Sequence, residues 1–297
     1  MNAYEVLVEG AVKSKRTVML VGGLDSGKST LAKTLLRAAV GAGRSAAFLD
    51  SDPGQKTVGP PASIGLKHIR DERILDDVDE LAVPDELAFV GGTSPQGHML
   101  PLVAGAARLL AKARGQGADF VAVDTSGMVS GIHGQVLKYH KLEMLRPDLV
   151  VGLQRGEELD PVLGIAQRFF GPEVVSLGVH PDVRATSVEQ RAANRELAMK
   201  RYFSGELHRF RVKPTVFMPA LPPMFDLAHL DHLLVGLSNG AGDYSGMGYL
   251  EWSPDEGVLR LISPVADAPK ALRLGSVRLE ESHRAKRVDL RNLFGTE

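Results

Sequence analysis

The stretch that decides the fold is Gly22-Gly-Leu-Asp-Ser-Gly-Lys-Ser29, which completes the pattern G-x-x-x-x-G-K-[ST]. An apolar run at 17–21 precedes it and is typical of a buried strand, and an apolar stripe over 31–39 predicts a helix that begins at Lys28. In such a loop, successive backbone N–H groups point into one concavity, and the positive end of the helix adds to their attraction for phosphate. The stretch therefore predicts a nucleotide-binding site.

The residue types in this loop predict individual roles. Lys28 is expected to contact the β- and γ-phosphate oxygens, and Ser29 to hold Mg²⁺. The expected nucleotide-binding residues are Gly22, Gly23, Leu24, Asp25, Ser26, Gly27, Lys28, Ser29 and Thr30. A chance Gly-rich turn is the alternative, but it does not account for a strand before the loop and a helix after it in the required order.

Composition narrows the class of protein. At 297 residues and 44% hydrophobic content, the chain can bury the core of one large domain with a smaller one. No run of about eighteen uncharged apolar residues occurs, and residues 1–9 carry two glutamates instead of a basic signal, so a cytoplasmic location without membrane contact is expected. The lack of cysteine excludes disulfides and cysteine-ligated zinc, and a net charge of −1 gives no global attraction to nucleic acid.

Short apolar runs alternate with helical patterns over the first two thirds of the chain. The runs lie at residues 46–49, 87–90, 120–123, 149–153 and 174–177. This alternation predicts an α/β fold of the P-loop NTPase type, with a parallel sheet flanked by helices. Asp50, Gly91 and Asp124 follow three of the runs, so we expect them beside the phosphate loop, where ligands bind at the carboxyl ends of parallel strands.

The pattern changes after about residue 205. Short strands punctuated by Gly and Pro predict a small β-rich C-terminal domain. The expected organisation is a P-loop domain over 1–205 and the β-rich domain over 206–297. Glycines gather between 236 and 248, which suggests a mobile loop or tight turns.

A pair of carboxylates follows the predicted strand at 46–49. Asp50 and Asp52 share one face of an extended backbone, beside the expected γ-phosphate. One could orient Mg²⁺ while the other accepts a proton from an attacking hydroxyl, and neighbouring carboxylates raise each other's proton affinity. A surface turn is the alternative for this pair. Asp124 is a further candidate for the metal site, with a helix cap or turn as its alternative.

A helix over 188–202 is predicted by the capping-box spacing of Ser187-Val-Glu-Gln190. It places Arg191 and Arg195 four residues apart, where like charges repel unless an anion lies between them. Because guanidinium groups suit phosphate oxygens, a lid over the transferring group is expected, and a solvated helix face is the alternative. Histidines 98, 133, 140 and 180 lack the i, i+4 spacing of a helical metal site.

These motifs together resemble the polyribonucleotide 5′-hydroxyl kinase family of RNA processing. The resemblance covers the phosphate loop, Asp50 to Gln55, Gly92-Thr-Ser-Pro95, Asp124-Thr-Ser-Gly127, Arg191 and Arg195 with Tyr202-Phe203, and Gly246-Met-Gly248 with Ser263-Pro-Val265. It implies an ATP- or GTP-dependent phosphotransferase that uses Mg²⁺. The γ-phosphate would move to the 5′-hydroxyl of single-stranded or end-exposed RNA, with DNA as a further candidate.

The residues and the resemblance together predict the site. The expected catalytic residues are Lys28, Asp52 as the base, Arg191 and Arg195, and the expected metal ligands are Ser29, Asp50 and Asp124. The resemblance implies that 125–128 form a clasp over the terminal nucleotide. The expected substrate-binding residues are Gln55, Thr93, Ser94, Thr125, Ser126, Gly127 and Met128.

Two departures from the family pattern stand out. A Trp often follows Thr-x-Gly in the clasp, whereas Met128 stands here. Stacking on an aromatic ring is worth roughly 1–3 kcal/mol per base, so a thioether should bind the terminal base less tightly. Larger family members also carry a β domain before the core, where only sixteen residues precede the first predicted strand here. Partner docking through that domain is expected to be missing.

Two other functions stay open at this point. One is a regulatory GTPase or ATPase switch, although the guanine-reading Asn-Lys-x-Asp run is absent. The other is a nucleotide-holding scaffold subunit of an RNA-processing complex, against which the intact Lys28 and Asp52 argue. The sequence does not indicate the preferred NTP, the choice between RNA and DNA, the pathway, the protein partners, the oligomeric state or the role of the C-terminal domain.

Overall fold

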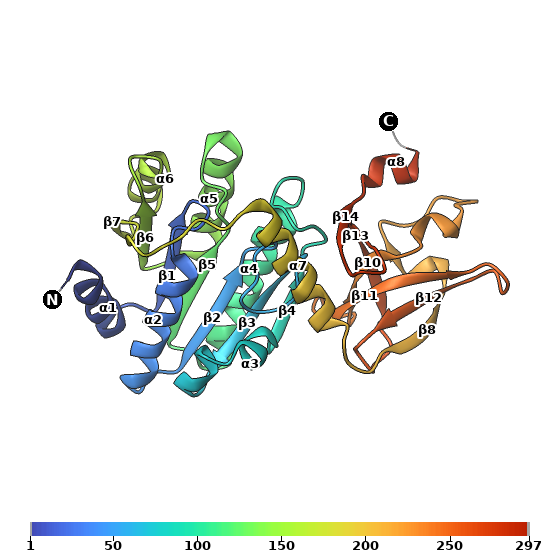
Figure 1. Cartoon of the computed structure of the whole chain (residues 1–297), viewed down its shortest axis with the longest axis horizontal. Helices are drawn as coiled ribbons and strands as arrows, with labels where there is room; N and C mark the ends of the chain where they lie inside the picture. The colour runs from blue at the N-terminus through green and yellow to red at the C-terminus, as the bar shows by residue number, and fades with distance from the viewer. Residues whose placement is uncertain (1, 296–297) are drawn as a thin grey trace.

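A sheet flanked by helices forms the N-terminal part of the chain (Figure 1). The computed structural model describes residues 2–295. The strands are β1 (Thr17–Gly22), β2 (Ala46–Ser51), β3 (Ser63–Ile69), β4 (Glu86–Phe89), β5 (Phe120–Thr125), β6 (Leu149–Gln154) and β7 (Glu173–Gly178). They lie in the order β4-β3-β2-β5-β1-β6-β7. The helices are α1 (Ala3–Ser14), α2 (Lys28–Gly41), α3 (Val78–Ala82), α4 (Met99–Gly115), α5 (Gly131–Leu145), α6 (Asp160–Ile165) and α7 (Val188–Tyr202), with short 3₁₀ and π turns at Glu72–Leu75 and Ala166–Phe170.

The predicted α/β P-loop fold is confirmed, and antiparallel strands extend it at one edge. β2, β5, β1, β6 and β7 pair in parallel, whereas β3 runs antiparallel to both β2 and β4. Residues 52–62 connect β2 to β3 without a helix. A parallel return usually needs a helical crossover of a dozen or more residues, so this connection reverses the chain instead.

Alternation along β1 assigns the helices to the two faces of the sheet. Val18 and Leu20 are buried in one core with α1 and α2, and Met19 and Val21 are buried in the other with α4, α5 and α6. Successive strand residues point to opposite faces, so a strand with apolar residues on both is covered on both. Within residues 2–295, no helix combines the length and the apolar character needed to cross a membrane.

The helix predicted after the phosphate loop is confirmed as α2. It begins at Lys28, and Leu31, Leu35 and Ala39 of the predicted apolar stripe are buried. Gly27 takes the position before it with a φ of 86°, a left-handed conformation that favours glycine. No described side chain caps this N-terminus, which leaves its first N–H groups free to bind an anion.

The C-terminal part is rich in β structure, as predicted. Its elements are β8 (His208–Val212), β9 (Phe217–Met218), β10 (Leu233–Ser238), β11 (Tyr244–Ser253), β12 (Val258–Ser263), β13 (Ala271–Leu279), β14 (Ala285–Arg287) and α8 (Leu290–Phe294), with 3₁₀ turns at Pro214–Val216 and Leu227–Leu230. The glycine-rich stretch at 236–248 lies in the antiparallel pair β10–β11 and its connecting turn, where Gly240 and Gly242 have positive φ. The tight-turn alternative therefore holds for this stretch.

The two parts of the chain share a core. β11 pairs with β4 through Tyr244 and Leu87, which makes the sheet continuous. Buried residues of β4, α7, β10 and β11 pack together beside this junction, among them Phe89 and Met247. The domain division at residue 205 stays a prediction, and residues 1, 296 and 297 of the predicted domains lie outside the described residues.

Candidate nucleotide-binding and phosphoryl-transfer site

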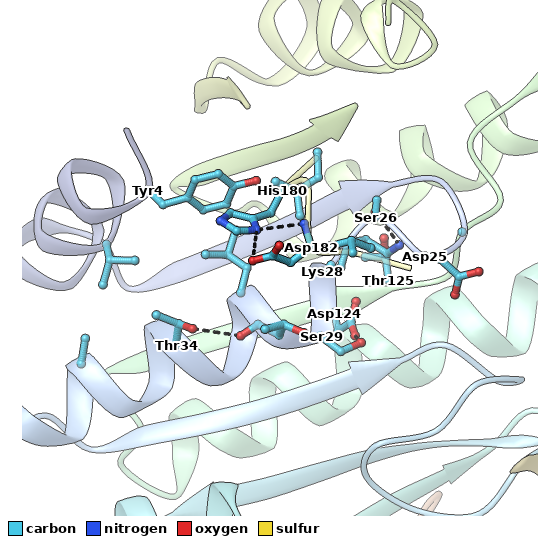
Figure 2. Close-up of a pocket in the computed structure, with 18 of the residues that line it drawn as sticks. Tyr4, Asp25, Ser26, Lys28, Ser29, Thr34, Asp124, Thr125, His180 and Asp182 are labelled. Atoms are coloured by element: carbon cyan, nitrogen blue, oxygen red, sulfur yellow. Dashed lines mark hydrogen bonds and ion pairs between the residues drawn. The ribbon is translucent and has the colours of Figure 1, made fainter. Parts of the chain in front are cut away.

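A cavity of about 1460 Å³ opens at the carboxyl ends of the parallel strands. The phosphate loop and Asp124 line one end, and α1 lines the other through Tyr4 and Val8. The connection after β7 adds His180 and Val183 to the wall. Figure 2 shows Lys28, Ser29 and Asp124 together, with Tyr4 and His180 on the side of α1. The cavity thus extends from the phosphate loop to α1.

The ammonium group of Lys28 lies over the phosphate loop. Its Nζ donates to the Gly23 carbonyl at 2.6 Å and to Ser26 Oγ at 3.2 Å. Burial lowers the pKa of Lys28, while the carboxylates of Asp124 and Asp52 oppose this shift. These bonds hold the lysine at the position where phosphate oxygens are expected.

Asp124 and Ser29 form the part of the site that fits a metal ion. Ser29 Oγ donates to Asp124 Oδ2 at 2.5 Å, and Asp124 Oδ1 is buried with no hydrogen-bond partner among the described residues. Burial raises the pKa of Asp124 to about 6; Asp50 and Asp52 add to the shift and Lys28 opposes it. A buried carboxylate oxygen without a partner, beside a hydroxyl, is a donor set that suits Mg²⁺.

No group of three or more His, Cys, Asp or Glu side chains in the described part of the chain could hold a metal on its own.

Asp50 does not fit its predicted role as a metal ligand. Its Oδ2 accepts from the N–H groups of Thr57 at 2.7 Å and Val58 at 2.9 Å. Its Oδ1 accepts from the N–H of Asp52 at 3.2 Å and from Lys56 Nζ at 3.1 Å, in an ion pair whose side chains are each 1% exposed. A carboxylate offers about four lone-pair sites, so Asp50 is saturated and organises the loop after β2.

Asp52 lines the cavity at the end of this loop. Its Oδ1 accepts from the N–H groups of Gly54 at 2.8 Å and Gln55 at 3.3 Å, which fixes the direction of the carboxylate. Burial raises its pKa; the N–H of Gly54 opposes the shift and the Asp50 charge adds to it. A Cβ at Gly54 would lie 2.7 Å from the Thr93 carbonyl oxygen, so the loop packs closely on the segment that follows β4.

The helix predicted over 188–202 is confirmed as α7, whose first turn is capped by the Ser187 hydroxyl. Arg191 donates to Asp25 Oδ2 at 3.0 Å and to the Thr186 carbonyl at 2.8 Å, and the Thr186 N–H donates to the same Asp25 oxygen at 2.9 Å. Burial and the neighbouring Arg191 lower the pKa of Arg195, and the charge of Asp52 opposes them. The N-terminal end of α7 is therefore tied to the phosphate loop through Asp25.

The segment predicted as the clasp rests on the phosphate loop. A Cβ at Gly127 would lie 2.8 Å from the backbone nitrogen of Leu24, so only glycine permits this approach. Thr125 lines the cavity, and its hydroxyl donates to the Leu20 carbonyl at 2.8 Å and accepts from Lys138 at 2.9 Å. Its role in substrate binding stays a prediction. Met128 is partly buried against the core, and Ser126 Oγ is buried without a described partner.

The other residues predicted to bind substrate are not all brought together. Gln55 lines the cavity, and its Nε2 donates to the Arg191 carbonyl at 3.3 Å. Thr93 and Ser94 do not line this cavity, and Ser94 is exposed with its hydroxyl accepting from the Gln96 N–H at 3.3 Å. A role for Thr93 and Ser94 stays a prediction.

Two buried lysines of α5 belong to the site and were missed. Lys141 Nζ donates to the Ser51 carbonyl at 2.9 Å and to Ser51 Oγ at 2.7 Å. Lys138 Nζ donates to Thr125 Oγ1 and, at 2.7 Å, to the Ser126 carbonyl. Burial lowers the pKa of Lys141 to about 8 and that of Lys138 well below its usual value. Their ammonium nitrogens lie beneath the ends of β2 and β5, and their positions on the apolar face of a helix could have indicated burial.

Comparison with known proteins identifies the family. The family model for the P-loop of the mRNA cleavage and polyadenylation factor CLP1 matches residues 22–205. The chain belongs to this family. The match begins at the phosphate loop and ends just after α7, so this CLP1 P-loop unit includes Asp52, Asp124, Arg191 and Arg195.

Curated relatives and a solved structure extend the likeness to the CLP1 family over most of the chain. The polyribonucleotide 5′-hydroxyl-kinase of Thermococcus kodakarensis is 30% identical over 318 residues, which cover 89% of this chain and 88% of that protein. The protein of the same name from Pyrococcus horikoshii is 29% identical over 326 residues, covering 91% and 88%. A chain in the wild-type Clp1p–Pcf11p complex superposes with a TM-score of 0.71 at 14% identity, covering 92% of this chain and 77% of that one. The fold is thus shared well beyond the phosphate loop.

Proposed function

We propose that this protein is a polynucleotide 5′-hydroxyl kinase that transfers the γ-phosphate of ATP or GTP to the 5′ end of RNA, with DNA as a second acceptor. One observation carries the proposal: the Asp52 carboxylate, the phosphate loop and Arg191 line one cavity, and the charge of Asp52 acts on Lys28 of the loop. The names of the relatives from Thermococcus and Pyrococcus support the same activity.

The nucleoside of the NTP is proposed to occupy the part of the cavity between α1 and α2. With the triphosphate on the phosphate loop, the base would lie towards Tyr4, Thr34 and His180, which also line the cavity (Figure 2). The rings of Tyr4 and His180 meet edge to face with centroids 6.0 Å apart. They give this wall an aromatic surface that suits a planar base.

The transfer is proposed to use the chain's own groups in fixed positions. Lys28 and the loop N–H groups bind the β- and γ-phosphate oxygens and neutralise charge as it develops. Ser29 and Asp124 would hold Mg²⁺, which supplies further charge neutralisation when bound. The oxygen of the 5′-hydroxyl forms a bond to the γ-phosphorus while the bond from the γ-phosphorus to the bridging β-phosphate oxygen breaks. Asp52 accepts the proton that the 5′-hydroxyl loses.

Arg191 is proposed to change partners during closure. In the structure it pairs with Asp25, whose side chain is 22% exposed. Phosphate oxygens accept two hydrogen bonds from one guanidinium group, so a bound triphosphate competes well with this single carboxylate oxygen. Arg195, which has its Arg191 neighbour and Asp52 within electrostatic reach, would then face the transferring group.

The test is transfer of label from γ-labelled ATP or GTP, with Mg²⁺, to matched RNA and DNA oligonucleotides that carry a 5′-hydroxyl or a 5′-phosphate. We expect label on the 5′-hydroxyl RNA alone or together with its DNA counterpart, and loss of transfer in Lys28→Ala and Asp52→Ala. Release of labelled phosphate without labelled oligonucleotide would instead support a regulatory NTPase. Bound nucleotide without turnover would support a scaffold subunit.

A further inference from the structure

One face of α7 connects the phosphate loop to the C-terminal domain. Arg191, Arg195, Met199 and Tyr202 recur at i, i+4, i+8 and i+11, and so lie along a single stripe of the helix. At the N-terminal end of the stripe, Arg191 contacts Asp25. At the other end, Met199 is buried in the core shared with β10 and β11. Figure 1 shows α7 crossing from the helical part of the molecule towards β11.

Tyr202 ends this stripe in a closely fitted site. Its hydroxyl accepts from the Met247 N–H at 2.8 Å. A Cβ at Gly246 would lie 2.8 Å from the Tyr202 hydroxyl oxygen and 2.5 Å from Val265 Cγ2, so glycine is needed for the ring to enter. We call the group Gly246, Met247, Ser263 and Val265 the lid socket.

Hydrogen bonds hold the lid socket in shape. Ser263 Oγ donates to the Met247 carbonyl at 2.9 Å and accepts from the Val265 N–H at 3.0 Å. A Cβ at Gly248 would lie 2.6 Å from the Ile262 carbonyl oxygen, which keeps β11 and β12 close behind it. The two C-terminal motifs that the phosphate-loop chemistry leaves unexplained, Gly246-Met-Gly248 and Ser263-Pro-Val265, are therefore the walls of one site.

We propose that the lid socket positions the lid: by holding Tyr202, it sets the rotation and tilt of α7 and hence where Arg191 and Arg195 lie above the phosphate loop. This inference rests on the proposed function. Eleven helical residues span roughly 16 Å, so a tilt of about 10° at the socket would move Arg191 by about 3 Å. Misplacement of a catalytic group by about 1 Å can cost about 100-fold in rate.

The first test is Tyr202→Phe in the full chain, which keeps the ring and removes the hydroxyl. We expect turnover to fall about tenfold or more while the KM for the NTP changes less than about threefold, because the altered contact acts on the transition state. The matched control is Tyr139→Phe, whose ring lies on α5 against Phe169 and Phe170 and should leave both constants unchanged.

A double mutant separates positioning from simple stabilisation. If Tyr202 acts through the lid arginines, Tyr202→Phe should cause little further loss of turnover in an Arg191→Ala background, because the two changes disable one device. A lower melting temperature with unchanged turnover below it would overturn the proposal. The proposal would also be overturned if the loss of turnover in the double variant equalled the product of the losses in the two single variants.

A second measurement does not depend on phosphoryl transfer. Hydrogen exchange of α7 amides is compared with and without a non-hydrolysable ATP analogue and Mg²⁺, in the wild type and in Tyr202→Phe. We expect the analogue to slow exchange in the wild type much more than in the variant. If the wild type transfers no phosphate but shows this difference, the kinase proposal fails and the socket stands. If the analogue slows exchange equally in both proteins, or in neither, the proposed role of the lid socket is overturned.

Discussion

Substituting Asp124 by asparagine should show how much the buried carboxylate at the expected metal site lowers the free energy of unfolding. The Asp124 side chain is buried, with the residue 4% exposed, and Oδ1 has no described partner. Burial raises its pKa from 3.8 to about 6. A raised pKa means that the folded chain binds this proton more tightly than the unfolded chain does, so stability falls as the pH rises from about 4 to about 6.

The magnitude follows from the shift. Two pKa units correspond to about 3 kcal/mol of unfolding free energy, all of it lost above about pH 6. An asparagine side chain at this position would keep an oxygen to accept from Ser29 and would carry no charge. Asp124→Asn should therefore raise the unfolding free energy of the metal-free, nucleotide-free protein by about 1–3 kcal/mol at pH 8 and change it little near pH 4.

Urea unfolding in EDTA at both pH values measures this difference. The control is Asp267→Asn, an exposed carboxylate that should show no such pH dependence. The same stabilised variant should lose its response to Mg²⁺ in phosphoryl transfer, since it lacks the anionic oxygen. Equal effects on unfolding at pH 4 and pH 8, or destabilisation at pH 8, would refute the reasoning.

Three further predictions concern the surroundings of this carboxylate. Lys141→Met removes a buried positive charge beneath the site and so raises the pKa of nearby carboxylates; the acid limb of the pH profile for transfer should move to higher pH. Gly127→Ala places a Cβ 2.8 Å from the Leu24 nitrogen and should weaken NTP binding about tenfold or more by calorimetry, whereas Gly115→Ala, with open space around it, should not. Arg191→Ala should lower turnover more than nucleotide affinity, and equal losses in both would reject a transition-state role.

Much of the fold follows from local sequence signals. The phosphate loop marks the start of α2, which has a periodic apolar pattern, and the Ser187 cap marks the start of α7, which has periodic charged residues. Both helices begin in the structure where these signals predict. β3 was missed, because it is an internal antiparallel strand whose apolar residues Ile64, Leu66 and Ile69 are interrupted by glycine and charged residues and so form no continuous apolar run. Its direction depends on the length of the connection and on pairing with β4, which are tertiary properties.

The site could be predicted where the position of a side chain on its helix or strand decides its contacts. It could not be predicted where nearby hydrogen-bond donors occupy the side chain. Ser29 and Asp124 meet as expected, since Ser29 lies in the first turn of α2 and Asp124 at the carboxyl end of β5. Asp50 shares its face with Asp52 by spacing, but the loop after β2 folds back and saturates it with donors. The buried lysine pair was missed because lysine is almost never fully buried unless it is paired, and its partners here are backbone and hydroxyl oxygens distant in sequence.

The most direct test of the central claim is a single-turnover measurement with Asp52→Asn, NTP, Mg²⁺ and 5′-hydroxyl RNA, accompanied by nucleotide titration. If Asp52 removes the proton of the attacking hydroxyl, transfer should fall by about 100-fold or more while NTP affinity stays within about threefold of the wild type. Transfer at close to the wild-type rate by Asp52→Asn would contradict the assignment of this carboxylate as the base.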